Sequence, residues 1–425
     1  MENLLHYVWK YKLYNPENLV TSSGNLISII DPGVRNTHAG PDFFNAKICI
    51  GNETWAGNVE IHTSASDWTK HGHHTDKAYN SVILHVVEYS NTEIYTANGR
   101  LVPQLILKIP EKIRENYEYL LSRESFVPCL SQIRDIPQLY LTDWMNALLI
   151  ERLERKTNDL QKLLKEYKGD WGEVFYITLS RNFGFGINND AFERLAKNLP
   201  LKYVLKHKDS VRQVEALFFG QAGLLNEEDE NEDDYYRLLK KEYDFLRKKF
   251  DLQPLEAHIF KNLRIRPNNF PHIKIAQLAA LARTQEALFS KMFELEDIQL
   301  LRNLFISELT EYWHIHYRFG KISPKRKKQI GLSAQNVILI NTVVPVLFAC
   351  GKAKNQLHWQ EKAIQLLASI KSESNYIVNE FTKAGICPCH AGDTQALIQL
   401  QKEYCEKKKC IFCRIGHKLL SKQVN

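Results

Sequence analysis

The sequence lacks long apolar runs, biased tracts and a recognisable leader. No stretch of its 425 residues approaches the ~18–20 uninterrupted apolar residues of a membrane helix. The first residues also lack the basic region and apolar core of a secretory signal. Apolar residues make up 44% and charged residues 25%, which excludes intrinsic disorder, collagen and a simple coiled coil. We therefore expect a cytoplasmic globular protein of two or three domains, with no membrane partner.

Charge, histidine and cysteine are unevenly spread along the chain. The net charge of +7 combines −3 over residues 1–120, −1 over 121–320 and +11 over 321–425. Seven of the fifteen histidines lie in the first 120 residues, and five of the eight cysteines lie within 387–413. Without an export signal, such crowding of cysteines favours metal binding over disulfides. We expect chemistry at the two ends and a structural role for the middle.

Hydrophobic periodicity predicts an α+β fold. A helix is expected over 3–14, and period-two patterns predict strands over 26–30, 43–50, 54–64, 82–89 and 101–109. Beyond Pro110 helical periods dominate, at 138–168, 190–207, 235–250, 273–295, 296–313 and within 335–381. The expected organisation is an N-terminal domain with a mixed sheet of about five strands, a large helical domain, and a basic helical region with a cysteine cluster, at 1–110, 111–320 and 321–425.

Two carboxylates are expected to meet on adjacent strands of the front domain. Asp42 opens the second strand, and alternation along the third places Glu60 and His62 on one face, opposite Val59 and Ile61. Paired carboxylates can hold a hard cation such as Mg²⁺ or Mn²⁺. The arrangement resembles the PD-(D/E)xK nucleases, in which an Asp begins one strand and a Glu or Asp precedes a Lys by two residues on the next.

The nuclease resemblance covers roughly residues 1–110 and departs from the family at one catalytic position. It implies that Asp42 and Glu60 bind the metal, but His62 stands where the family has lysine. A histidine is neutral for much of its population near pH 7, so His62 would act as a ligand or general base instead.

A second group of histidines follows in the segment from Asp67 to Asp76. Because imidazole binds Mn²⁺, Zn²⁺ and iron readily, His71, His73 and Asp76 are candidates to complete or flank the metal site. The alternative is a polar surface loop, which the neighbouring Lys70 and Lys77 would suit. His85, in an apolar strand, is either a hydrogen-bonded core residue or part of the site.

Several motifs together are similar to a bacterial family of unknown function, domain of unknown function 2851. The resemblance spans nearly the whole chain and implies no activity. It is carried by segments at 39–43, 55–62, 66–68, 71–76, 82–87, 181–186, 266–278 and 404–416.

Two basic segments are candidates for contact with phosphates. Lys325, Arg326, Lys327 and Lys328 lie in a run that could neutralise phosphates without reading sequence. Arg264 and Arg266 belong to a second polar stretch. The alternatives are a solvated loop and a structural connection.

The cysteines of the tail have the spacing of metal ligands. Cys410 and Cys413 form a CxxC pair, and Cys405 is near enough to join them. We take Cys389 as the fourth ligand of a structural zinc site, with Cys387, His390 and His417 as other choices. Reduced buried thiols and an iron–sulfur cluster stay open, because spacing does not exclude a cluster.

The sequence favours a metal-dependent phosphodiesterase, a divergent nuclease acting on DNA or RNA. Asp42, Glu60 and His62 would be its catalytic residues. One alternative is a non-catalytic nucleic-acid-binding or scaffold protein with a degenerate nuclease-like domain. A second is a histidine-rich metallohydrolase of a small substrate. The sequence gives no basis for naming a protein partner.

Overall fold

The computed structural model describes residues 2–17, 19–225, 233–306 and 308–421, which form two compact units. Unit 1 comprises residues 1–144, 379–386 and 400–425, and unit 2 comprises 145–378 and 387–399. The C-terminal segment therefore belongs with the N-terminal domain, which differs from the expected division into three consecutive segments.

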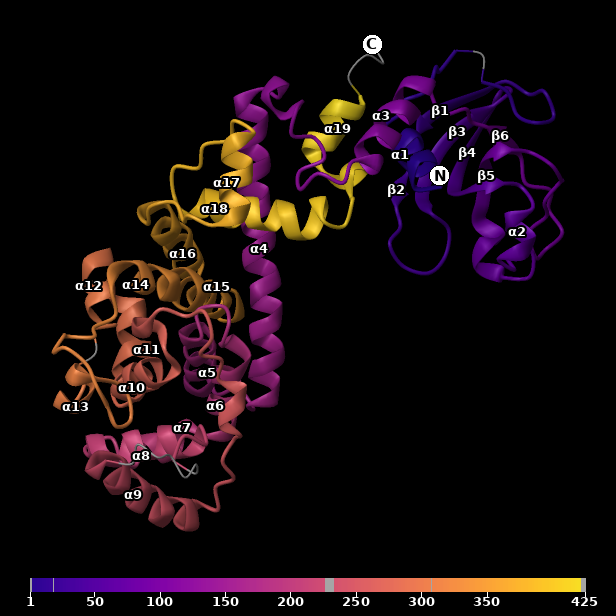
Figure 1. The fold of residues 1–425 in the computed structure, drawn as a ribbon. Coiled ribbons are helices and arrows are strands. Elements are labelled where there is room, and N and C mark those ends of the chain that lie inside the picture. Colours follow the sequence, from indigo (N-terminus) through magenta and orange to yellow (C-terminus); the bar gives the residue numbers. More distant parts are fainter. Residues whose placement is uncertain (1, 18, 226–232, 307, 422–425) are drawn as a thin grey trace. The chain divides into compact units, whose positions relative to one another are not determined.

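Unit 1 is built on a six-stranded mixed sheet (Figure 1). The strand order is β1-β3-β4-β5-β6, with β2 paired to β3 at one end. β3 and β4 are antiparallel, whereas β4 and β5 are parallel and are joined by a crossover that carries α2 and η1. The elements are α1 (Glu2–Lys10), β1 (Ile27–Asp31), β2 (Val34–Arg35), β3 (Phe43–Ile50), β4 (Glu53–Ser64), α2 (Asp67–Lys70), η1 (Lys77–Ser81), β5 (Val82–Tyr89), β6 (Gln104–Ile106), α3 (Glu111–Ser122), η2 (Ile133–Asp135), η6 (Leu400–Cys405), η7 (Cys410–Phe412) and α19 (Arg414–Leu420).

The alternation along β4 separates an apolar face from a polar one. Val59 and Ile61 enter the main core with Leu4, Val8 and Trp9 of α1. Their neighbours Glu60 and His62 are also buried, but they meet the segment that connects β4 to β5. A second, smaller core under that segment contains Trp68, Tyr79, Val82, Ile94 and Val102. The site residues of β4 are thus held between two packed layers.

Unit 2 is helical apart from a short hairpin. α4 begins in unit 1 and continues into unit 2, and α17 ends in unit 1. The elements are α4 (Gln138–Glu166), α5 (Trp171–Phe183), α6 (Asn189–Asn198), α7 (Leu201–Leu205), α8 (Val211–Gln221), α9 (Asp234–Phe250), η3 (Ala257–Ile259), η4 (Pro267–Asn269), α10 (Pro271–Ala282), α11 (Gln285–Glu294), α12 (Ile298–Asn303), α13 (Glu311–Ile315), β7 (His316–Arg318), β8 (Lys321–Ile322), α14 (Leu332–Ile338), η5 (Leu339–Val343), α15 (Val344–Ala353), α16 (Leu357–Ser369), α17 (Tyr376–Lys383) and α18 (Ala391–Gln399).

The α+β prediction is confirmed, and its errors lie at element ends and in predicted helices that the structure divides, such as 190–207, which forms α6 and α7. The first helix stops at Lys10 instead of residue 14, because Lys12 adopts a left-handed backbone with φ of 51°. The helix expected over 273–295 is two helices that meet at Arg283 and Thr284. The helix expected over 296–313 is also two helices, the first capped by the Asp297 carboxylate.

One helical stretch, Leu332–Ala353, is long and apolar enough by composition to cross a membrane. It comprises α14, η5 and α15, and 67% of its most apolar window is buried inside the protein. Such burial is typical of a core helix in a soluble protein.

Candidate metal centre

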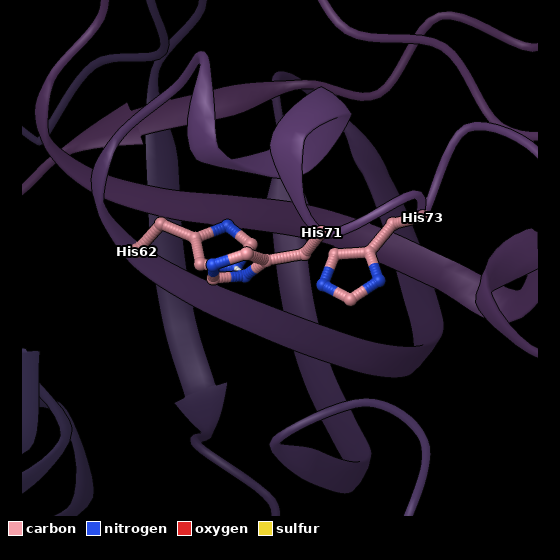
Figure 2. Close-up of side chains that lie close together, drawn as sticks. All are labelled: His62, His71 and His73. Carbon is pink, nitrogen blue, oxygen red and sulfur yellow. Dashed lines mark hydrogen bonds between the residues drawn. The ribbon is translucent and has the colours of Figure 1, made fainter.

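Three imidazoles converge on the polar side of β4. One ring nitrogen each of His62, His71 and His73 can be chosen so that all three lie within 4.8 Å of one another. His71 Nδ1 is 3.1 Å from His62 Nε2, and the rings of His62 and His73 stack with their centroids 5.3 Å apart. Figure 2 shows the three side chains meeting from β4 and from the turn after α2. Three clustered imidazoles form a donor set for Mn²⁺, Zn²⁺ or iron.

Local sequence features hold the two loop histidines in place. Trp68 is fully buried and donates its indole N–H to the Tyr95 carbonyl over 3.0 Å, which anchors α2. Gly72 then takes a φ of +79°, a conformation that suits glycine, and the chain turns between His71 and His73. Tyr79 stacks on His73 with ring centroids 3.8 Å apart. His71 stays exposed, whereas His73 is buried.

Glu60 joins the imidazoles to Asp42. Its Oε1 lies 3.2 Å from His73 Nε2 and 3.5 Å from His62 Nε2. Its Oε2 accepts the Asp42 amide N–H at 3.0 Å, while Asp42 Oδ2 accepts the Ile61 amide N–H at 3.0 Å. The two carboxylates therefore lock β3 to β4 beside the histidines, on the face that alternation predicts.

The pKa values of the Glu60 and Asp42 carboxyl groups are shifted in opposite directions. Burial raises the pKa of Glu60, and the neighbouring charge of Asp42 raises it further, although His73 acts against both. Burial alone would raise the pKa of Asp42, but the contact with His6 and the Ile61 amide outweigh burial and lower it. Asp42 is therefore the carboxylate that stays ionised most readily.

His85 supports His62 from the adjacent strand. Its Nε2 lies 2.9 Å from His62 Nδ1, and its other ring nitrogen has no hydrogen-bond partner among the described residues. Burial, with smaller contributions from His73 and His71, lowers the pKa of His62 to about 4. His62 is thus neutral near pH 7 and keeps a ring nitrogen lone pair for a metal.

His6 of α1 is a site residue that the sequence did not indicate. Its Nε2 lies 3.3 Å from Asp42 Oδ2, while Arg35 lies 3.4 Å from its Nδ1. His6 is buried on the same helix as the core residues Leu5 and Val8, so periodicity alone marks it as packing. Only the contact between α1 and the start of β3 reveals its place beside the carboxylate.

Asp76 caps a helix instead of facing the histidines. Its side chain is at the N-cap of η1 and accepts the Ala78 amide N–H at 2.9 Å. It is exposed and lies outside the group formed by His62, His71 and His73. The expectation that Asp76 completes the metal site therefore finds no support in the geometry.

Substitution of Asp76 separates capping from metal binding. Asp76→Ala should lower the free energy of unfolding by about 1 kcal/mol through loss of the cap. Asp76→Asn keeps a capping side chain but removes the charge, so both stability and metal affinity should stay near wild type. Denaturant unfolding and metal titration measure the two quantities. A tenfold loss of affinity in Asp76→Asn would return Asp76 to the ligand set.

The basic candidates all belong to unit 2 and differ in accessibility. Arg264 and Arg266 line a cavity of about 380 Å³ together with Lys274, and 325–327 are exposed. The prediction that Lys328 contacts phosphate is wrong. Its side chain is buried, and its ammonium group donates to the carbonyls of Trp313 and His314. Lys328 therefore stabilises the packing around Trp313 and His314 and is not available to a phosphate.

The predicted fourth cysteine of the tail also requires a correction. Cys405, Cys410 and Cys413 line one small cavity of unit 1, and the fourth cysteine on that cavity is Cys129. Cys389 is exposed on unit 2, where its amide donates to Asp393. A thiol that is 276 residues before Cys405 in sequence cannot be found from ligand spacing.

Fold and site together define an α+β protein whose sheet domain carries a candidate three-histidine metal centre beside two carboxylates. The chain belongs to the family described as protein of unknown function (DUF2851), whose model matches residues 2–376. This confirms the family resemblance seen in the sequence. No curated protein and no solved structure matches the chain, so the nuclease resemblance is not confirmed by any of these comparisons.

Proposed function

We propose that this protein is a metal-dependent hydrolase of phosphodiester bonds, with nucleic acid as its substrate. The observation that carries the proposal is the convergence of His62, His71 and His73, with Glu60 in contact with two of them and hydrogen-bonded to Asp42. Carboxylates and imidazoles meet here in one largely buried polar cluster. Polar clusters with shifted pKa values are candidates for active sites.

The donor set narrows the choice of metal. Mg²⁺ prefers oxygen ligands and keeps several waters, whereas three imidazoles suit Mn²⁺, Zn²⁺ or Fe²⁺. Mn²⁺ accepts both carboxylate oxygen and imidazole, so it fits the nitrogen ligands together with Glu60. A bound ion of this kind would lower the pKa of water and stabilise negative charge on the phosphoryl oxygens.

Asp42 is the better placed of the two carboxylates to orient a water molecule. Its side chain is 26% exposed, so water can reach it, and its lowered pKa keeps it ionised. The Ile61 amide fixes one carboxylate oxygen, which leaves the other free to orient a water molecule. His6, whose Nε2 lies 3.3 Å from Asp42 Oδ2, would hold this carboxylate in position.

Basic side chains elsewhere in the chain support a polyanionic substrate. Residues 321–425 carry a net charge of +11, and 325–327 are exposed. Arg264 and Arg266, which are both exposed, add a second cationic patch beside a cavity. Contacts of this kind bind the phosphate backbone without reading its sequence.

Cleavage assays test the proposal. Purified protein should cleave single- or double-stranded DNA or RNA when Mn²⁺ is supplied, and chelation should stop cleavage. Asp42→Asn and Glu60→Gln should each lower the rate by roughly 10²–10⁴-fold, the usual contribution of a general acid or base. The exposed Lys70→Ala variant is the matched control and should keep full activity. The proposal would be refuted if no metal supports cleavage. It would also be refuted if Asp42→Asn and Glu60→Gln cleave at the wild-type rate.

A small-molecule metallohydrolase is the second candidate. The nitrogen-rich ligand set favours it, because three histidines are a common catalytic zinc site. Turnover of a small phosphodiester or ester with Zn²⁺, without affinity for polynucleotides in a salt titration, would favour this candidate.

A further inference from the structure

Four cysteines surround one cavity in unit 1, remote in sequence from the histidine cluster. Cys129 lies in the segment after α3, whereas Cys405 ends η6, Cys410 begins η7 and Cys413 precedes α19. The remaining lining is mostly apolar and includes Leu120, Val127, Leu400 and Ile415. All four cysteines are free of disulfides. Cys413 is buried, and the other three are partly buried.

The four sulfurs are close enough to influence one another. Burial raises the pKa of Cys129 to about 12, with further contributions from Cys413 and Cys410. Burial likewise raises the pKa of Cys405, and Cys413, Cys129 and Cys410 add to the shift. Buried free cysteines pack as small hydrophobic residues, so what sets these four apart is that they meet around one cavity.

We propose that Cys129, Cys405, Cys410 and Cys413 bind an iron–sulfur cluster. The three C-terminal cysteines are separated by four and by two residues, which is the C-x₄-C-x₂-C arrangement of a class of [2Fe–2S] proteins whose fourth cysteine is distant in sequence. Here the fold supplies the distant fourth cysteine as Cys129. The proposal is independent of the function assigned to the histidine cluster.

Hydrogen-bond donors already point at one of the sulfurs. Burial raises the pKa of Cys413, and the amides of Gly416 and Ile415 and the indole of Trp144 act against this rise. The Trp144 indole N–H is buried, and within the described part of the chain it has no hydrogen-bond partner. Donors of this kind tune and stabilise thiolate ligands.

A glycine adapts the turn around the cysteines. A Cβ at Gly416 would collide with the carbonyl of Cys410, so the close approach of α19 to η7 requires glycine. Cys410 and Cys413 both line the cavity beside this turn. The local sequence is thus shaped to present two thiols to one centre.

The cluster would fasten the C-terminal segment onto the N-terminal domain. α19 packs against α3, Ile411 and Leu420 enter the main core, and His417 Nδ1 lies 2.9 Å from the Tyr7 hydroxyl on α1. A cross-link between residues 129 and 405 closes a long stretch of chain, and such closure stabilises the folded state through the unfolded one. Because α1 also carries His6, loss of the cluster would disturb the position of His6 beside Asp42.

Metal analysis of the full-length protein tests this proposal. Anaerobically purified or reconstituted protein should contain iron and acid-labile sulfide in equal amounts and show the visible absorption of a cluster. Cys129→Ser, Cys405→Ser, Cys410→Ser and Cys413→Ser should each lose most of both, whereas the matched control Cys389→Ser should keep them. One zinc per chain without sulfide, or no metal after reconstitution, would overturn the proposal.

A second measurement avoids variants that fold poorly. In reconstituted wild-type protein, Cys129, Cys405, Cys410 and Cys413 should resist alkylation, while Cys387 and Cys389 should react rapidly. Removal of iron and sulfide by a chelator and an oxidant, followed by reduction, should make all four reactive together. Protection of Cys389 with free reaction of Cys129 would show that the ligand set is different.

Discussion

Replacement of His71 by alanine is expected to abolish tight metal binding without harming the fold. His71 is exposed, so its removal costs little packing, yet its Nδ1 lies 3.1 Å from His62 Nε2 in the imidazole group. Second-shell partners of metal ligands typically contribute roughly 10–100-fold in affinity, so loss of a direct ligand should cost at least about 100-fold. Isothermal titration with Mn²⁺ and Zn²⁺ measures this change.

His74 provides a matched control for this experiment. It is also an exposed histidine of the same turn, but it lies outside the group of converging ring nitrogens. His74→Ala should therefore bind metal and unfold as the wild type does. Equal affinities for His71→Ala and His74→Ala would show that the three-histidine cluster is not a metal site. If the proposed function is right, cleavage activity should follow metal affinity across the two variants.

The local part of the site could be predicted because strand alternation is a local property. The side chains of Glu60 and His62 share a face since two residues on a strand return to the same side. The register then follows from the apolar neighbours Val59 and Ile61, which have to enter the main core. Pairing of Phe43 with Val59 in the antiparallel ladder brings the start of β3, and thus Asp42, beside Glu60.

The remaining parts depend on contacts between distant segments, which periodicity does not encode. His6 looks like a core residue of its helix, and only packing of α1 onto the sheet places it at Asp42. Lys328 looks like one of four surface cations, but the fold buries it against two carbonyl groups. Cys129 has no cysteine near it in sequence, so ligand spacing favoured Cys389 instead.

The division into units has the same physical origin. Residues 321–425 were expected to form a region of their own because their charge differs from that of the front domain, but residues 400–425 belong to unit 1. Charge describes the surface, whereas Ile411 and Leu420 decide where the segment packs, and they enter the core built by α1 and the sheet. Apolar side chains in a charged segment are therefore the better guide to its place in the fold.

Replacement of His85 by leucine should weaken metal binding although His85 is not part of the three-histidine cluster. For Nε2 of His62 to bind an ion, its Nδ1 has to carry the hydrogen, which can then be donated to His85 Nε2 over 2.9 Å. Leucine fills the buried space but leaves that N–H without an acceptor. We expect metal affinity to fall by roughly 10–100-fold, the usual effect of losing a second-shell partner.

A glutamine at the same position distinguishes positioning from packing. The side-chain oxygen of His85→Gln can accept the His62 N–H, so this variant should recover most of the affinity that His85→Leu loses. Thermal unfolding of both apoproteins shows whether either change disturbs the fold, because His85 is fully buried. If His85→Leu binds Mn²⁺ and Zn²⁺ as tightly as the wild type, His62 does not bind the ion through Nε2. In that case the contact between His62 and His85 would only stabilise the pairing of β4 with β5.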